Sequence, residues 1–208
     1  MSEIKIEPGG ICPLFSHPLY LSRTPHNLSE TEHKIILDEK QNTQVNYDNN
    51  LIGNHKYILN KLPKLKSYIE EEIHNYFHNV MEYGETQKIY ITNSWSNYNK
   101  PGTKNHLHKH PNSIVSGVYY IIDGDTAPIE FHSDTNKYLL NLNVKKANLY
   151  NSNRVWFNPI NHHLFLFPST LMHEVAVNKS NATRISISFN TFIKGPTGSD
   201  QGHTTIKL

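Results

Sequence analysis

The spacing of apolar side chains changes from a helical to a strand-like period part-way along the chain. Over residues 62–81, apolar and aromatic side chains recur mostly every three or four positions, which predicts an amphipathic helix to about Met81, with Gly84 as the residue that stops it. A shorter helix is predicted over residues 30–40, because Ser29 and Glu32 stand at the spacing of a capping box. Helical structure is therefore expected before Gly84.

Beyond Gly84, apolar and polar residues alternate with a period of two, which is typical of β-strands. Strands are predicted over residues 88–96, 113–123, 128–133, 163–169, 173–177 and 183–192. Because these segments are short, nearly evenly spaced and separated by Gly, Pro, Asn and Asp, they favour a sandwich or a barrel. Residues 11–22 are interpreted as a first strand that proline interrupts, and residues 41–56 as a loop.

These patterns together predict a mainly β chain that forms one domain over residues 1–208. A layer made of the first strand and the helices, about residues 1–84, is expected to cover one face of the sheet. The β core is expected over about residues 88–192. The last residues, about 193–208, contain Gly, Ser and Thr and are expected to be loosely held.

Composition excludes several classes of function. The 208 residues carry a net charge of +2, and their lysines and arginines are scattered, so neither nucleic acid nor a membrane is indicated as a partner. Cys12 is the single cysteine, and the N-terminal sequence lacks the apolar core of a signal peptide, so we expect a reducing, cytoplasmic location. The number of subunits is left open, with a homodimer as a candidate.

The stretch NHLHKHPNS places His106, His108 and His110 at alternate positions. If the segment is extended, all three imidazoles point to the same face, and two of them can bind one metal ion. His173 is the best candidate for a third ligand, because it opens the strand that follows a buried-looking strand and a proline turn. An ordinary histidine at the start of a strand is the alternative.

The last predicted strand, RISISFNTF, has two different faces. One face is largely apolar, and the other carries Arg184, Ser186, Ser188 and Asn190. Arginine is suited to bidentate binding of a carboxylate, and a buried Arg184 would require an anion. The alternative is a surface strand on which Arg184 is solvated.

The pattern HxH, then FPSxLxHxV, then RxSxSFN, with SGVYYI after the histidine pair, resembles the 2-oxoglutarate- and Fe(II)-dependent oxygenases. It looks closest to a small, prolyl-hydroxylase-like group of bacterial and phage members. The resemblance covers roughly residues 88–192 and implies a double-stranded β-helix, or jelly roll. It also implies Fe(II) as the metal and 2-oxoglutarate as a small-molecule cosubstrate that is decarboxylated to succinate while an unidentified substrate is hydroxylated.

The resemblance assigns roles residue by residue. His173 matches the distal metal ligand, and Arg184 matches the residue that binds the far carboxylate of 2-oxoglutarate, with Ser186 beside it. Tyr120 matches a tyrosine that hydrogen-bonds the same carboxylate in prolyl-hydroxylase-like members. This chain departs from the pattern at the second ligand, because most members have Asp or Glu where this segment offers only histidine.

Two registers remain open for the histidine pair. The short link to the next strand favours His108 and His110 as the ligands, with His106 further along the strand, next to a ligand or on the substrate side. The alternative pair of ligands is His106 with His108. The substrate side is assigned to Asn93, Trp95 and Asn190, although a core position for the tryptophan is equally compatible with the sequence. Residues 133–159 are interpreted as a substrate lid or as a solvated loop.

Two other functions fit the same residues. A cupin-type metalloenzyme that needs no 2-oxoglutarate would use a similar barrel, although cupins usually place a glutamate where Asn112 and Ser113 stand here. A jelly-roll protein that binds zinc only for stability would need no turnover. Peptides, small metabolites and nucleobases are all compatible as substrates.

Overall fold

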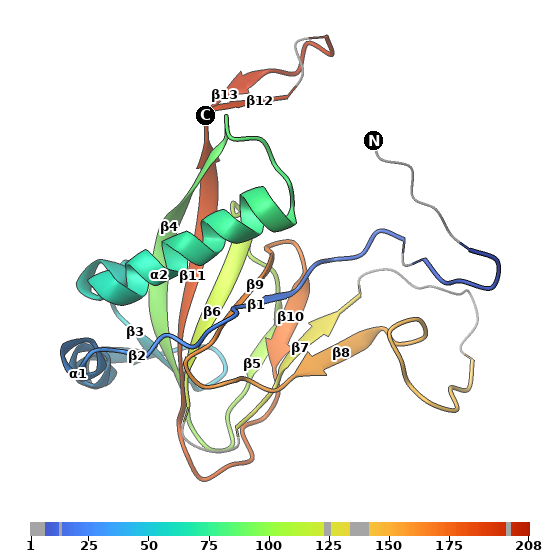
Figure 1. The fold of residues 1–208 in the computed structure, drawn as a ribbon. Helices are drawn as coiled ribbons and strands as arrows, with labels where there is room; N and C mark the ends of the chain where they lie inside the picture. The colour runs from blue at the N-terminus through green and yellow to red at the C-terminus, as the bar shows by residue number, and fades with distance from the viewer. Residues whose placement is uncertain (1–6, 13, 123–125, 134–141, 199–200) are drawn as a thin grey trace.

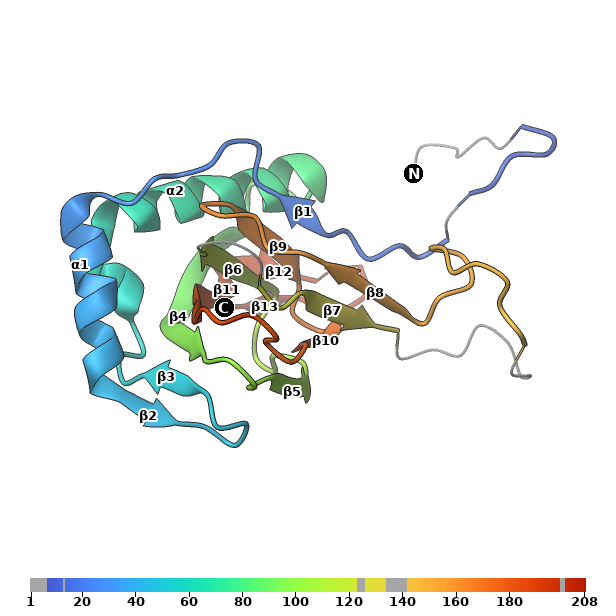
Figure 2. The same ribbon diagram turned by 90° about the horizontal axis from the view of Figure 1, so that it is seen from below.

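Two antiparallel β-sheets face each other, and the helices cover the outer face of the larger sheet (Figures 1 and 2). The coordinates are a computed structural model that describes residues 7–12, 14–122, 126–133, 142–198 and 201–208. The larger sheet contains β1 (Tyr20–Leu21), β9 (Leu164–Pro168), β6 (Val115–Ile121), β11 (Arg184–Lys194), β4 (Lys88–Asn99), β3 (Leu51–Gly53) and β2 (Thr43–Val45), in that order. The smaller sheet contains β5 (Asn105–His108), β10 (Met172–Val175), β7 (Ile129–His132) and β8 (Arg154–Phe157). The mainly β, jelly-roll architecture expected from the sequence is confirmed.

Each strand predicted beyond Gly84 exists, with bounds that shift by a few residues. The largest change is in β4, which continues to Asn99 because it pairs with β11 as far as the pair Arg184 and Asn99. On β11 the two faces separate as predicted: Ile187 and Phe189 are buried towards the helices, whereas Arg184 lies on the opposite, inner side.

Two predictions for the N-terminal region are wrong. The first strand is limited to Tyr20 and Leu21, which pair with β9, so most of residues 11–22 is not β-structure in the part described. Residues 41–56 are not a simple loop, because they contain β2 and β3. These short strands pair with each other, and β3 pairs with β4, so together they extend the edge of the larger sheet through a contact distant in sequence.

Helix α1 (Glu30–Glu39) begins with the predicted capping box, in which Ser29 and Glu32 satisfy each other's backbone N–H groups. Glu32 also accepts hydrogen bonds from the backbone N–H groups of Lys64 and Leu65, at 2.9 and 3.0 Å. These two residues open helix α2 (Pro63–His74), so a single buried carboxylate stabilises the N-termini of both helices.

Helix α2 continues as a π-helical turn, η3 (Asn75–Val80), and short 3-10 turns occur at η1 (Lys40–Asn42) and η2 (Ile58–Lys61). The predicted helix end near Met81 is confirmed, because η3 ends at Val80 with Met81 as its C-cap, but Gly84 is not the residue that terminates it. The chain leaves the helix at Glu82, which takes up a left-handed conformation with φ of 55°. The N–H groups of Met81 and Tyr83 then bond back to helical carbonyls, which is how a C-terminal cap works.

The core has two parts. The larger lies between the helices and the larger sheet, and the smaller lies between the two sheets, where Phe131 contacts Phe167 with ring centroids 5.0 Å apart. Gly117 on β6 has no side chain because Phe189 and Leu166 occupy the space where a Cβ would stand.

Two segments outside the predicted strands contain β-structure. Residues 133–159, expected to be a lid or a solvated loop, include β8, while residues 134–141 lie outside the described part of the chain. The C-terminal segment forms a small hairpin of β12 (Pro196–Thr197) and β13 (Ile206–Lys207), whose connection includes residues that are not described. Among the described residues, no helix is both long and apolar enough to cross a membrane.

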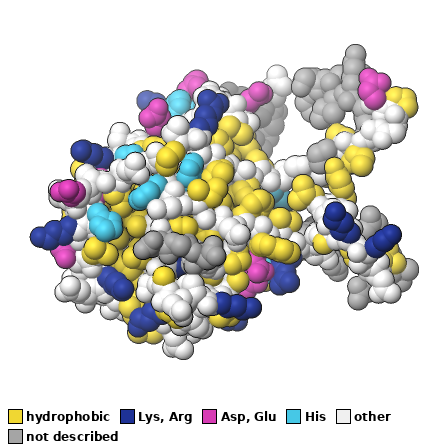
Figure 3. Space-filling model, turned by 60° about the horizontal axis from the view of Figure 1, so that its bottom comes forward, with side chains coloured by type: hydrophobic (Ala, Val, Ile, Leu, Met, Phe, Trp, Pro, Cys, Tyr) yellow, Lys and Arg dark blue, Asp and Glu magenta, His cyan; other side chains and the backbone are white. Residues whose placement is uncertain are grey.

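Figure 3 shows the lower face of the molecule, where lysine and arginine side chains are scattered and histidine and hydrophobic side chains gather near the centre.

Candidate metal centre

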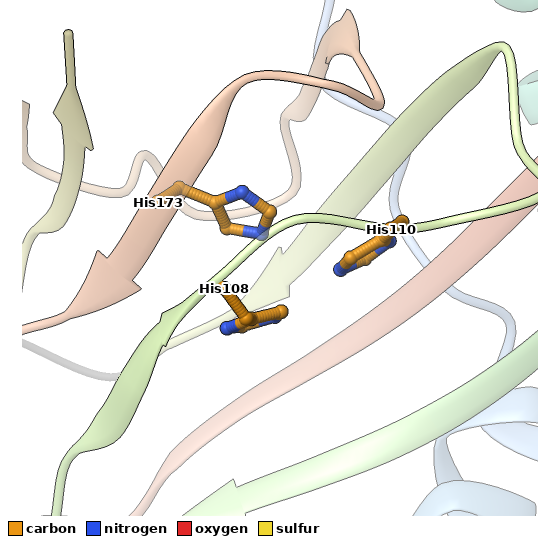
Figure 4. A group of neighbouring side chains, drawn as sticks. All are labelled: His108, His110 and His173. Carbon is orange, nitrogen blue, oxygen red and sulfur yellow. The ribbon is translucent and has the colours of Figure 1, made fainter. Parts of the chain in front are cut away.

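Three histidines from two distant segments of the chain meet between the two sheets (Figure 4). His108 ends β5 and lies directly opposite His173 on β10, and His110 follows on the loop after β5. One ring nitrogen of each residue lies within 4.8 Å of the other two. The structure therefore brings together the three residues that the sequence singled out as a metal-binding set.

The second ring nitrogen of each histidine is held by a hydrogen bond. Nδ1 of His108 donates to the backbone carbonyl of His106 at 2.7 Å, and Nδ1 of His173 donates to the carbonyl of Leu171 at 2.9 Å. Nδ1 of His110 donates to Oδ1 of Asn190 at 2.5 Å. Because a carbonyl oxygen can only accept, each proton lies on Nδ1, which leaves the Nε2 lone pair free for a metal.

Burial keeps these imidazoles in the form that binds metals. Burial lowers the pKa of His108 and of His110, and it lowers the pKa of His173 to about 3. A neutral imidazole is a ligand, whereas an imidazolium is not, so the three residues are ready to bind at neutral pH.

His106 lies outside this group. Its Nδ1 donates to Oδ2 of Asp48 at 2.7 Å, and its backbone N–H bonds to the same oxygen at 2.9 Å. Asp48 comes from the turn between β2 and β3, so His106 anchors that turn to β5. The sequence offered no signal for this contact, since the two residues are 58 positions apart.

Arg184 is buried on the inner face of β11, with a relative exposure of 2%. Its Nη1 donates to Oδ1 of Asn99 at 3.2 Å and to Oγ of Ser186 at 3.4 Å. Its Nε is buried and has no hydrogen-bond partner in the structure, and the salt bridges of the described residues include none to Arg184. A buried cation with an unused N–H favours binding of an anion, which is what the sequence led us to expect if Arg184 is buried.

Tyr120 completes this pocket. It lies opposite Ser186 in the pairing of β6 with β11, and its ring is 4.9 Å from the guanidinium carbon of Arg184. Its hydroxyl is buried without a hydrogen-bond partner, and burial raises its pKa to about 12, so it remains a donor. Two unused donors, the tyrosine hydroxyl and the arginine Nε, are suited to an anionic acceptor such as a carboxylate.

Comparison with protein families gives a match over residues 93–190 to the family described as "Putative 2OG-Fe(II) oxygenase". The chain resembles the 2-oxoglutarate- and Fe(II)-dependent oxygenases. The match begins at Asn93 and ends at Asn190, so it includes the three histidines, Tyr120 and Arg184. Comparison with curated proteins finds no match.

Solved structures of oxygenases share the fold at low sequence identity. A prolyl hydroxylase from Trichoplax adhaerens, in complex with a hypoxia inducible factor peptide fragment, is 16% identical with a TM-score of 0.56, covering 84% of this chain and 83% of its own. A Pseudomonas putida prolyl-4-hydroxylase is 12% identical with a TM-score of 0.54, covering 85% and 94%. The carbocyclase SnoK from nogalamycin biosynthesis is 13% identical with a TM-score of 0.57, covering 90% and 85%.

His110 is held by a polar network around its Nδ1, made by Asn190 and Ser116. Oδ1 of Asn190 accepts the hydrogen bond from Nδ1 of His110 and also accepts one from Oγ of Ser116 at 2.9 Å. Ser116 lies 2.8 Å from Oγ of Ser169, which donates to Ser113. The sequence placed Asn190 on the substrate side and missed Ser116 and Ser169, whose only signal was that they belong to the SGVYYI and FPS motifs.

The remaining residues expected on the substrate side lie on β4. The ring of Trp95 is 5.8 Å from that of His110 and is half-buried, and its Nε1 donates to Oδ1 of Asn97 at 3.2 Å. Asn93 lies opposite Asn190 in the pairing of β4 with β11. Trp95 therefore faces the histidine group rather than the core under the helices.

Proposed function

We propose that this chain is a 2-oxoglutarate- and Fe(II)-dependent dioxygenase that hydroxylates an organic substrate. One observation carries the proposal: three imidazoles with free Nε2 atoms share the interior with a buried arginine and a buried tyrosine whose donors are unused. The first group suits a divalent transition metal, and the second suits a carboxylate. A site that binds only a metal for stability would not need the second group.

In this proposal His108, His110 and His173 hold the metal through Nε2, each fixed by the hydrogen bond on its Nδ1. Fe(II) bound there supplies the activation of dioxygen that couples decarboxylation of 2-oxoglutarate to oxidation of a substrate C–H bond. Three neutral imidazoles leave the full charge of the ion uncompensated, which favours binding of the anionic cosubstrate.

Arg184 and Tyr120 orient the cosubstrate. The guanidinium of Arg184 donates to the distal carboxylate, and Asn99 and Ser186 keep it in place. The hydroxyl of Tyr120 donates to the same carboxylate, and burial of the pair excludes water and strengthens both hydrogen bonds.

Substrate would approach from the side of β4, where Trp95 and Asn93 stand near His110. The similar structures suggest two substrate classes to screen, because one is a complex with a peptide and another comes from the biosynthesis of a small molecule. A peptide or a small metabolite is therefore proposed, with an aromatic contact at Trp95.

The decisive experiment measures release of succinate from 2-oxoglutarate. The protein is prepared without oxygen, with or without Fe(II), and mixed with a pool of peptides or of metabolites. Succinate is then measured after dioxygen is admitted. His108→Ala and His110→Ala should lose both the metal and the activity, whereas the control His106→Ala should keep the metal. Turnover that needs the metal but not 2-oxoglutarate would indicate a cupin-type enzyme. Chelation that lowers the melting temperature of a protein with no turnover would indicate a structural metal.

A further inference from the structure

A second group of metal-binding side chains lies at the C-terminal end of α2, on the helical layer outside the larger sheet. His74 is the last residue of α2, His78 lies in the π-helical turn η3, and Glu85 is in the loop that leads to β4. One donor atom from each lies within 4.8 Å of the other two. We propose that His74, His78 and Glu85 form a second site for a divalent transition metal, with Zn²⁺ as the best-suited ion.

The donor set fits this class of ion. Two histidines four positions apart on a helix face the same side, and their ring centroids here are 4.5 Å apart. Two imidazoles with one carboxylate are a ligand set that zinc takes in proteins, with a fourth position left for water. The negative charge of Glu85 attracts the cation.

His78 is already oriented for binding. Its Nδ1 donates to the backbone carbonyl of Tyr83 at 3.0 Å, which leaves the lone pair on Nε2. Its side chain has a relative exposure of 4%, and its ring packs edge-on against Phe77 at 5.0 Å. Such a ring loses little rotational freedom when it binds an ion.

The turn that ends the helix positions the third proposed ligand, Glu85. The left-handed residue Glu82 reverses the chain, and the N–H of Tyr83 bonds back to the carbonyl of Phe77 at 3.2 Å. A carboxylate oxygen of Glu85 is thereby brought to within 4.8 Å of a ring nitrogen of each histidine. Within the described residues, the salt bridges of Glu85 include no lysine or arginine, so this carboxylate is available for a metal.

Electrostatics distinguish this group from another cluster of similar composition, formed by Glu130, His132 and Glu174. There Arg154 lies 3.3 Å from Glu130, and His132 lies 2.9 Å from Glu174. The guanidinium would repel a cation, and both carboxylates already have partners. That cluster is an ion-pair network, and it carries no metal proposal.

The test is a Zn²⁺ titration of the full-length, tag-free protein against a competing chromophoric chelator, in a His108→Ala background that disables the proposed iron site. This variant should still bind one Zn²⁺ tightly. Adding His74→Ala should weaken that binding by at least about 100-fold, because losing an outer-shell partner of a ligand already costs about 10–100-fold. His78→Ala and Glu85→Gln should act in the same direction.

The controls separate folding, location and the two sites. His74 is exposed, so its replacement leaves folding unchanged even if His78→Ala, which removes a buried ring, does not fold. The exposed histidine variant His17→Ala should leave Zn²⁺ binding intact, as should Glu174→Gln in the ion-pair network. Equal Zn²⁺ affinity with and without His74→Ala would overturn this site. Equal titrations of wild type and His108→Ala would instead count against the proposed iron site alone.

Discussion

Replacing Arg184 by methionine tests whether the buried guanidinium binds 2-oxoglutarate. Arginine can make two charge-assisted hydrogen bonds to a carboxylate, each contributing about 1.5–3 kcal/mol. Losing both would cost about 3–6 kcal/mol, which corresponds to a roughly hundredfold to ten-thousandfold increase in Kd. The metal should bind as before, because none of the three histidines hydrogen-bonds Arg184.

The stability of the unliganded protein should respond differently. Burying a guanidinium without an anion is unfavourable, so methionine, which has a similar shape and no charge, removes that penalty. It also leaves Oδ1 of Asn99 without its donor, which costs about 1–3 kcal/mol. We therefore expect a change in the melting temperature of only a few degrees without ligand, and loss of the increase that 2-oxoglutarate produces in the wild type.

The measurement is an anaerobic calorimetric titration of 2-oxoglutarate into Fe(II)-loaded protein, together with thermal unfolding with and without the ligand. Arg154→Met is the matched control, because Arg154 is an arginine at the surface of β8 that pairs with Glu130. A folded, metal-loaded Arg184→Met protein with unchanged 2-oxoglutarate affinity would refute the assignment. Arg184→Lys should give an intermediate affinity, since it keeps the charge and loses the bidentate geometry.

Three further predictions concern positioning and stability. Asn190→Ala removes the acceptor that orients His110, so Fe(II) affinity measured by chelator competition should fall about 10–100-fold, and unchanged affinity would contradict this role. Glu32→Ala should lower the free energy of unfolding, measured in urea, by about 2–4 kcal/mol, because the N-termini of two helices lose a hydrogen-bond acceptor. A loss below about 1 kcal/mol would contradict this double capping role. Gly117→Ala places a methyl group against Phe189 and should cost about 1–3 kcal/mol or more in the same assay.

The contribution of Glu32 should also depend on pH in a defined direction. Burial alone raises the pKa of Glu32, but hydrogen bonds from Leu65, Ser29 and Lys64 outweigh burial and hold the pKa below its usual range. A carboxyl whose pKa is lower when folded stabilises the protein above its unfolded pKa and loses that effect as pH falls through the folded pKa. Wild type should therefore lose stability on acidification relative to Glu32→Gln, and parallel pH profiles would contradict this reasoning.

Local patterns were sufficient for much of the fold. Strand alternation located β4, β6, β7, β9, β10 and β11, and the capping box located α1, because both signals lie within a few neighbouring residues. The same alternation assigned Arg184 to the polar face of β11, and its burial followed once that face was enclosed between two sheets. The short edge strands β2 and β3 were missed, since each has only three residues and their attachment to the sheet is the pairing of β3 with the distant β4.

Part of the candidate site could likewise be predicted from the sequence, and part depended on the tertiary structure. Sequence alone supplied the histidine-rich strand, His173 and Arg184, because each stands in a recognisable local motif. The short link to the next strand favoured His108 and His110, but the pair His106 and His108 stayed open, since alternation alone makes the three side chains equivalent. Only the folded chain separates them: Asp48 turns one imidazole away, and Asn190, 80 residues from His110, holds another beside its partners. Contacts over such distances depend on how the sheets stack, and that is decided by packing of the whole core rather than by any single segment.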